Sequence, residues 1–169
     1  MFDLGRTFLA AVERSPDATA IVDGKRRVGY ASWYEEIARI AGGLTALGLR
    51  RGDRLAVILQ NRLEMASLHW ACQLAAIVVT PLNWRIKPEQ LDYCLADANA
   101  AAIVFDDVAA DTVASAATAQ RLARIAIGNI DGATCRFEDL QGGANGLWPS
   151  RPPASTSATT QAPLSASRP

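Results

Sequence analysis

Two polar residues in the run PLNWR, Asn83 and Arg85, carry the side chains best suited to holding a ligand. An amide both donates and accepts hydrogen bonds, and a guanidinium presents a fixed fork of donors to a carboxylate or phosphate. The run follows an apolar segment typical of a buried strand, and ligand crevices of α/β proteins form beyond the carboxyl ends of such strands. Asn83 and Arg85 are therefore weak candidates for the wall of a ligand crevice. The simpler alternative is that both side chains fix the loop that leaves the strand.

Other residues with reactive side chains lack the partners that chemistry requires. His69 is the only histidine, and it lies between Leu68 and Trp70 with no carboxylate or nucleophile at a useful spacing. This setting favours a core or interface histidine over a general base. Asp106 and Asp107 could bind Mg²⁺, but adjacent carboxylates point apart, and capping of the next helix explains them more simply. We therefore predict no catalytic, cofactor-binding or metal-ligating residue in this chain.

The glycine pair at positions 42 and 43 could be taken for half of a dinucleotide-binding fingerprint. That fingerprint needs the spacing GxGxxG directly after a strand. Here the pair follows a helical run, and the spacing is absent. Close packing of this helix against a neighbour is the better explanation.

Composition and charge restrict the class of protein. The chain has 169 residues, enough for one domain with a substantial core. Its 17 basic and 17 acidic residues give a formal net charge of zero, so we expect no nucleic-acid partner. The longest apolar stretch, residues 63–82, is interrupted by polar and charged side chains, which argues against a membrane span. Three widely spaced cysteines without a CxxC pair fit a cytoplasmic location.

The elements that must position these residues are short apolar runs alternating with amphipathic helical runs. Such alternation predicts an α/β fold with a mainly parallel, doubly wound sheet, whose strand order cannot be read from the sequence. Helical patterns occupy residues 2–15, 32–48, 62–77, 87–98 and an alanine-rich run after 107, and strand patterns occupy 18–23, 27–30, 54–59, 78–80, 101–105 and 124–127.

Local signals mark where several of these elements begin and end. Asp23-Gly24 predicts a hairpin turn between the first two strands. Ser32 followed by Glu35 predicts a capping box at the start of the second helix, and Gly48 suits the left-handed residue that ends it. Asn61 is the expected cap of the third helix.

The last part of the chain has a different composition. Its final twenty-two residues, WPSRPPASTSATTQAPLSASRP, contain five prolines, five serines and no acidic residue. Such a segment cannot bury enough apolar surface to order itself. We therefore predict one α/β domain over residues 1–140 and a disordered Pro/Ser/Ala-rich tail over residues 141–169.

Three segments together resemble one enzyme family. They are AIVDGKRRVGYASWYEEIARIAGGL, LGLRRGDRLAVILQNRLEMASLHWACQLAAIVVTPLNWR and PEQLDYCLADANAAAIVFDD. Their order and spacing resemble the N-terminal portion of the acyl-adenylate-forming enzymes, the AMP-dependent synthetases and ligases that include acyl-CoA synthetases. The resemblance covers residues 2–107 and implies the N-terminal part of the large α/β domain of that family.

The resemblance also implies an activity for full-length relatives. They activate a carboxylic acid with ATP and Mg²⁺ to an acyl-adenylate, and then transfer the acyl group to coenzyme A. The family's Ser/Thr/Gly-rich phosphate loop and its later lysine have no counterpart in this sequence. We therefore expect a truncated acyl-CoA synthetase-like protein that needs no cofactor and is inactive alone, with fatty, aromatic and alicyclic acids all open as substrates of the relatives. Whether the chain is an enzyme stays open, and the alternative is a non-catalytic α/β binding or interaction module.

Two further expectations follow from the missing segments. A partial copy of the family's fold would leave an apolar face uncovered, which favours self-association. In addition, the codons for residues 157–165, read in another frame, permit the family-like string YNSGTT. We hypothesise a frameshift around residues 148–154, and the gene sequence tests it.

Overall fold

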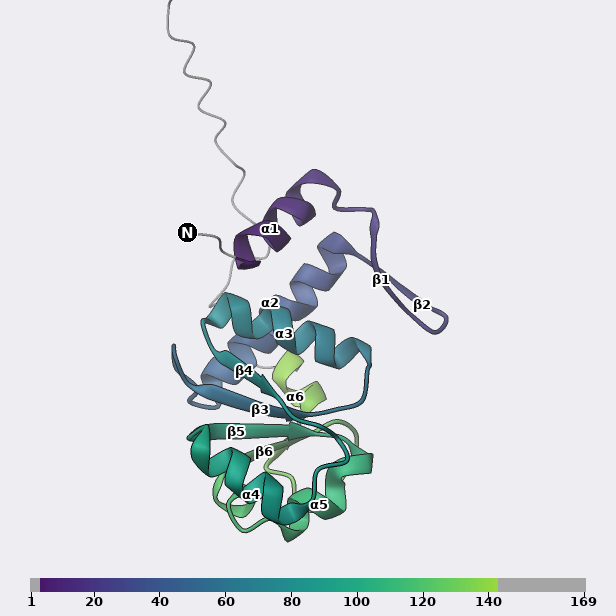
Figure 1. Ribbon diagram of the computed structural model, residues 1–169. Coiled ribbons are helices and arrows are strands. Elements are labelled where there is room, and N and C mark those ends of the chain that lie inside the picture. Colours follow the sequence, from purple (N-terminus) through teal and green to yellow (C-terminus); the bar gives the residue numbers. More distant parts are fainter. Residues whose placement is uncertain (1–3, 143–169) are drawn as a thin grey trace, which may run out of the picture.

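The computed structural model describes residues 4–142, which fold into an α/β domain with a five-stranded, all-parallel sheet between two helical layers (Figure 1). The predicted fold class is confirmed. Gln141 and Gly142, the first two residues of the predicted tail, belong to helix α6, and the rest of the tail and the frameshift hypothesis lie outside the described residues. In chain order the elements are α1 (Leu4–Arg14), β1 (Thr19–Asp23), β2 (Arg26–Gly29), α2 (Tyr30–Ala46), β3 (Arg54–Ile58), α3 (Leu63–Ala75), β4 (Val78–Pro81), α4 (Pro88–Asp97), β5 (Ala100–Phe105), the 3₁₀ turn η1 (Asp107–Ala109), α5 (Ala110–Ser115), the 3₁₀ turn η2 (Ala119–Arg121), β6 (Ala123–Ala126), β7 (Cys135–Arg136) and α6 (Phe137–Gly142).

The strand order is β4-β3-β5-β6-β7, so the chain reverses its direction of travel across the sheet once. From β3 the chain passes through α3 to β4 on one side, and it then returns past β3 to place β5 on the other side. Helices α2, α3 and α6 cover one face, and α4 and α5 cover the opposite face (Figure 1). In β3, Leu55 and Val57 face the first layer, whereas Ala56 and Ile58 face the second. This alternation explains why β3 reads as continuously apolar.

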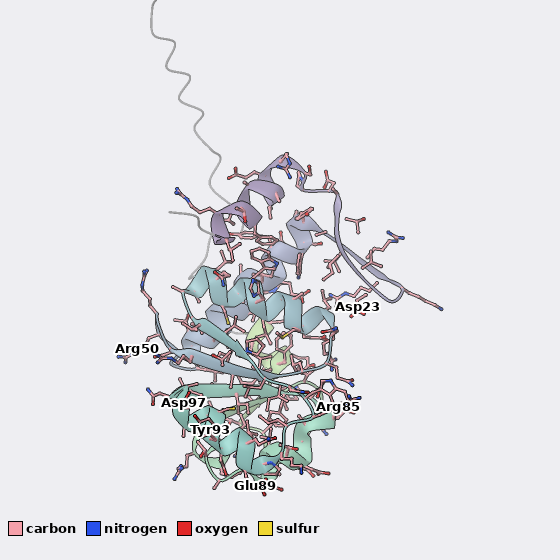
Figure 2. The ribbon with its side chains drawn as sticks, in the orientation of Figure 1. Asp23, Arg50, Arg85, Glu89, Tyr93 and Asp97 are labelled. Atoms are coloured by element: carbon pink, nitrogen blue, oxygen red, sulfur yellow. The ribbon has the colours of Figure 1, made fainter. Side chains whose placement is uncertain are left out.

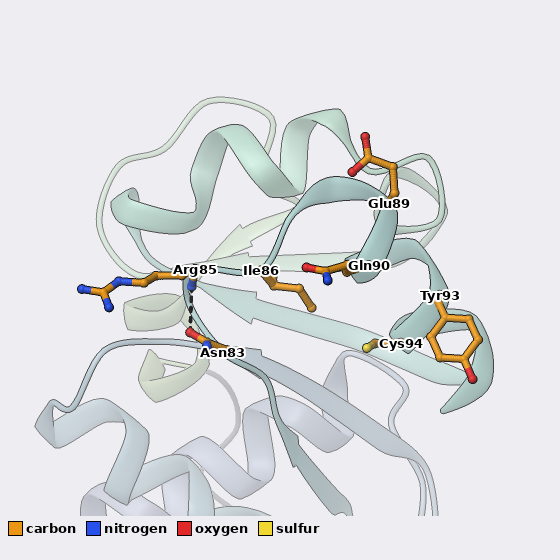
Figure 3. A pocket seen from close by; sticks show the side chains of 7 residues that line it. All are labelled: Asn83, Arg85, Ile86, Glu89, Gln90, Tyr93 and Cys94. Carbon is orange, nitrogen blue, oxygen red and sulfur yellow. Dashed lines mark hydrogen bonds between the residues drawn. The ribbon is translucent and has the colours of Figure 1, made fainter.

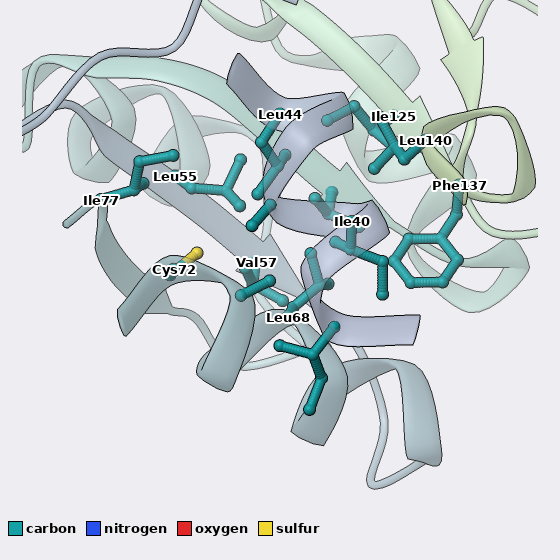
Figure 4. Close-up of a cluster of buried hydrophobic side chains, with 14 of the residues drawn as sticks. Ile40, Leu44, Leu55, Val57, Leu68, Cys72, Ile77, Ile125, Phe137 and Leu140 are labelled. Atoms are coloured by element: carbon teal, nitrogen blue, oxygen red, sulfur yellow. The ribbon is translucent and has the colours of Figure 1, made fainter. Parts of the chain in front are cut away.

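The larger core lies between the sheet and the layer formed by α2, α3 and α6 (Figure 4). Here α6 packs directly against α2 at the predicted close approach. A Cβ atom at Gly43 would lie 2.5 Å from the carbonyl oxygen of Leu140. Only a glycine lets the two backbones approach this closely. Cys72 lies in the same core, where burial raises the pKa of its thiol to about 12 and keeps it unreactive.

The predicted turn at Asp23-Gly24 and the end of α2 are observed. Strands β1 and β2 pair antiparallel, with Gly24 at φ +56° in the connecting turn. Gly48 has φ +97° just after α2, which is the left-handed conformation that ends a helix. Both features could be predicted from the sequence because a turn or a helix end depends mainly on its own residues.

The predicted capping box of α2 is wrong. The helix begins at Tyr30 with Gly29 as its N-cap, and no side chain caps it. Ser32 is already inside the first turn, where its hydroxyl donates to the carbonyl oxygen of Gly29 at 3.1 Å, and Glu35 is exposed. The reason is that β2 leads into the helix without a loop, so the helix starts two residues before the expected cap.

None of the helices within residues 4–142 is both long and apolar enough to traverse a lipid bilayer.

Candidate functional site at the carboxyl edge of the sheet

The strand order fixes where a ligand crevice can form. In an open parallel sheet, the crevice lies where two neighbouring strands send their following connections to opposite faces. Strand β3 continues into α3 on one face, and its neighbour β5 continues into η1 and α5 on the other. The switch point therefore lies beyond the carboxyl ends of β3 and β5, next to the β3–α3 turn (residues 59–62). Sequence reasoning had placed the crevice one strand away, after β4.

A buried carboxylate occupies this switch point. Asp106 directly follows β5 and is only 1% exposed. Its Oδ2 accepts a long hydrogen bond from the backbone N–H of Gln60 at 3.4 Å and lies 3.7 Å from Nη1 of Arg62. Its Oδ1 has no hydrogen-bond partner among residues 4–142. The predicted helix-capping role of Asp106 is wrong, because its side chain makes no capping bond to η1 and reaches across to β3.

Arg62 links this carboxylate to a second one. Its Nε and Nη2 donate to Glu64 at 2.8 and 3.4 Å, a bidentate pairing, while Nη1 faces Asp106. The hydrogen bond to Glu64 raises the pKa of Arg62. Burial alone would raise the pKa of Glu64, but the hydrogen bond and charge of Arg62 lower it below its usual value. All three guanidinium nitrogens are thus directed at carboxylates of the protein.

The start of α3 is held by a residue far away in the chain. The expected cap Asn61 makes no capping bond, and the observed N-cap, Arg62, has none from its side chain either. Instead, the backbone N–H of Leu63 donates to Oδ2 of Asp23 at 3.3 Å. Figure 2 shows Asp23 on the same side of the molecule as Arg85, toward which the strands point. The hairpin therefore supplies the acceptor that the local sequence of α3 lacks.

A second series of hydrogen-bonded polar side chains lies between α2 and α3, and the sequence analysis did not predict it. The indole N–H of Trp33 donates to Ser67 Oγ at 2.9 Å, and that hydroxyl donates to Oε1 of Glu36 at 3.4 Å. Arg26 of β2 then pairs with Oε2 of Glu36 at 3.1 Å. The sequence carried one indication of these contacts. Glu36 directly precedes Ile37 at the apolar stripe of α2, and an acid in such a position needs a partner.

The sequence-predicted candidates Asn83 and Arg85 line an open groove of about 560 Å³ between the β4–α4 loop and α4 (Figure 3). Asn83 accepts a hydrogen bond from the backbone N–H of Arg85 at 3.0 Å. The guanidinium of Arg85 lies 4.2 Å from the ring centre of Trp84 and extends away from the groove (Figure 3). Asn83 therefore fixes the loop that leaves β4, which agrees with the simpler alternative. A ligand-wall role for the two residues stays a prediction.

The remaining candidates do not join either group. His69 is partly buried on α3, with its ring edge-on to Trp70 at 5.2 Å. Asp107 begins η1 and is exposed. A further carboxylate, that of Asp92 on α4, accepts hydrogen bonds from the backbone N–H groups of Thr118 and Ala117, which lower the pKa of its carboxyl. Within residues 4–142, no three His, Cys, Asp or Glu side chains are arranged as a metal site requires.

Comparison with known proteins places this architecture in a family. The sequence model of the family described as AMP-binding enzyme matches residues 8–161, which is most of the chain. The chain belongs to the AMP-binding enzyme family. The predicted resemblance is therefore confirmed, and the match continues beyond residue 140 into the segment outside the described residues.

Relatives of this AMP-binding family protein carry the names of CoA ligases. A feruloyl-CoA synthase from Amycolatopsis sp. is 37% identical over 137 residues, which are 81% of this chain and 28% of the relative. A 2-succinylbenzoate–CoA ligase from Bacillus cereus (strain Q1) is 32% identical over 92 residues, 54% of this chain and 19% of the relative. The chain thus spans less than a third of the length of these curated relatives.

Solved structures share the fold. A benzoate CoA ligase from Burkholderia xenovorans LB400 superposes with a TM-score of 0.76 at 20% identity, covering 94% of this chain and 31% of that chain. The N-terminal domain of FACL13 from Mycobacterium tuberculosis gives a TM-score of 0.70 at 24% identity, covering 85% and 37%. At these identities the likeness concerns the fold.

Three carboxylates, those of Asp23, Glu64 and Asp106, lie around the β3–α3 turn, and the guanidinium of Arg62 is directed at two of them. The charge of Arg26 also acts on Glu64. The polar groups described at this turn therefore pair with one another and support the turn.

Proposed function

We propose that residues 4–142 form scaffold of an ATP-dependent carboxylic acid–CoA ligase, and that the 169-residue chain does not activate a carboxylic acid by itself. The observation that carries this proposal is the carboxylate-rich switch point, where Arg62 is already paired with Glu64 and Asp106. The names of the relatives support the reaction class, the formation of a thioester from an acid. ATP, Mg²⁺ and coenzyme A would be held by residues that full-length relatives carry elsewhere.

The test is ATP–pyrophosphate exchange by the purified chain with ferulate, 2-succinylbenzoate and a medium-chain fatty acid. A full-length feruloyl-CoA synthase serves as the positive control, and a cooperative urea unfolding curve shows that the chain is folded. We expect exchange at the level of the blank with every acid. Exchange above the blank that depends on the added acid would refute the proposal.

A second candidate, a non-catalytic interaction module, draws support from the surface. The large exposed hydrophobic side chains of residues 4–142 are spread over different elements, namely Leu4, Val22, Leu47, Val78, Tyr93 and Val108. Scattered exposure of this kind is common on self-contained monomers. In the edge strand β4, Pro81 also lacks the N–H that an added strand would bind. Light scattering after size exclusion discriminates between the two candidates. Self-association favours the scaffold, whose apolar face is covered only in the complete fold, and a stable monomer favours the interaction module.

A further inference from the structure

The β1–β2 hairpin projects from the domain (Figure 1), and the two residues that flank its turn, Asp23 and Arg26, contact the start of α3 and α2. At the end of β1, Asp23 accepts the hydrogen bond from the N–H of Leu63. At the start of β2, Arg26 pairs with Glu36 at 3.1 Å and its charge also lowers the pKa of Glu64. The hairpin is thus joined to α2 and to the first turn of α3.

Beyond Arg26, charges of alternating sign continue toward the switch point. Glu64 receives two hydrogen bonds from Arg62, and Arg62 faces Asp106 at the end of β5. The same Asp106 holds the backbone N–H of Gln60 in the β3–α3 turn. Each carboxylate in this series has a cationic neighbour on at least one side, so displacing one member alters the balance at the next.

Local sequence gives the β3–α3 turn little support of its own. The start of α3 has no side-chain cap from residues next to it. A carboxylate at a helix N-terminus offsets the positive end of the helix dipole, and Asp23 is the residue that provides it. The turn is therefore held mainly by groups from the hairpin and from β5.

We propose that the β1–β2 hairpin is a strap that positions the β3–α3 turn: Asp23 holds the start of α3, and Arg26 ties the hairpin to Glu36 of α2, so that Gln60 and Arg62 reach Asp106. This role does not depend on ligase activity, so its test can fail or succeed separately from the proposed function.

Amide hydrogen exchange of the full 169-residue chain, resolved by NMR, tests the strap. In Asp23→Ala and Arg26→Met we expect the N–H of Gln60 to exchange about tenfold faster, because the turn opens locally more often. The N–H of Ile125 in β6 should keep its rate. Matched controls are Asp17→Ala and Arg27→Met, which remove the same charges from exposed residues without a side-chain partner among those described. Gln60 rates equal to those of the controls would overturn the proposal.

A global loss of stability would speed exchange everywhere, so a reciprocal measurement is needed. Coupling free energies are reciprocal. Arg62→Met at the switch point should therefore accelerate exchange in the hairpin, relative to Ile125 of the same variant. Glu64→Gln, a half-buried conservative change, should do so by a smaller factor. Hairpin rates that follow Ile125 in both variants would contradict the strap.

Discussion

Two neighbouring loops at the carboxyl edge of the sheet are held in different ways. The β3–α3 turn takes its partners from distant parts of the chain. Gln60 binds Asp106, 46 residues later, and Leu63 binds Asp23, 40 residues earlier. The guanidinium of Arg62 also faces Asp106.

In the β4–α4 loop, the polar side chains of Asn83 and Arg85 find their partners within the loop, and the distant contacts are made through backbone groups of Leu82 and Ile86. Asn83 accepts the N–H groups of Arg85 through its side chain and of Ile86 through its carbonyl. The Arg85 guanidinium lies over the adjacent Trp84. Because Asn83 and Arg85 are exposed, water can replace a lost partner there, whereas a partner lost near Asp106 leaves a buried group unpaired. Substitutions should therefore cost far more in the first loop than in the second.

The largest difference is expected from removing the guanidinium on each side. Arg62→Met should lower the free energy of unfolding by about 3 kcal/mol, because Asp106 keeps a buried charge with no cation beside it. The matched change Arg85→Met should alter it by less than about 0.5 kcal/mol. Urea denaturation measures both. Adding Asp106→Asn to Arg62→Met should recover part of the loss, and strictly additive effects would contradict the pairing.

A smaller loss is expected from the polar chain behind the turn. Ser67→Ala leaves the buried indole N–H of Trp33 without its acceptor, and we expect a cost of roughly 1–2 kcal/mol. Ser32→Ala is the control, because this exposed hydroxyl bonds only the carbonyl of Gly29 and should cost less than about 0.5 kcal/mol. Equal costs for the two serines would show that the buried chain is no stronger than a surface contact.

The third effect concerns pH. Folding lowers the pKa of Glu64, so its contribution to stability is complete above the usual glutamate pKa of about 4.3 and is lost as the pH falls through the lowered value. Glu64→Gln should therefore flatten the decline in stability on acidification below about pH 4.3. Unfolding curves recorded between pH 6 and roughly 3 test this. An unchanged slope would mean that Arg62 does not favour the ionised carboxylate.

The smallest effect is expected from Asn83→Ala. Losing the turn bond to the N–H of Arg85 should cost about 0.5 kcal/mol, since the exposed N–H then bonds water. NMR chemical-shift changes should stay within residues 82–87. Shifts that reach the β3–α3 turn would show that the two loops are coupled, and would weaken the contrast between them.

The sequence predicted the turn at Asp23-Gly24 and the left-handed Gly48, which depend on near neighbours. It also indicated close packing at Gly43, but not its partner, because Leu140 lies far along the chain. The capping role predicted for Asn61 is wrong because any nearby acceptor can bind the free N–H groups at the start of a helix. In α3 the distant Asp23 provides this acceptor. The helix-capping role predicted for Asp106 is wrong for a similar reason. Its partners Gln60 and Arg62 come close to it only when β3 and β5 pair.

By itself, the sequence determined the types of the elements and their order along the chain, because apolar periodicity and turn residues act over a few positions. It also carried the three segments that resemble the AMP-binding family. Only the tertiary structure decided that β5 lies beside β3 and not beside β4, and this order places the switch point at Arg62 and Asp106. Strand order depends on how whole helical layers cover the two faces of the sheet, and no local pattern encodes that.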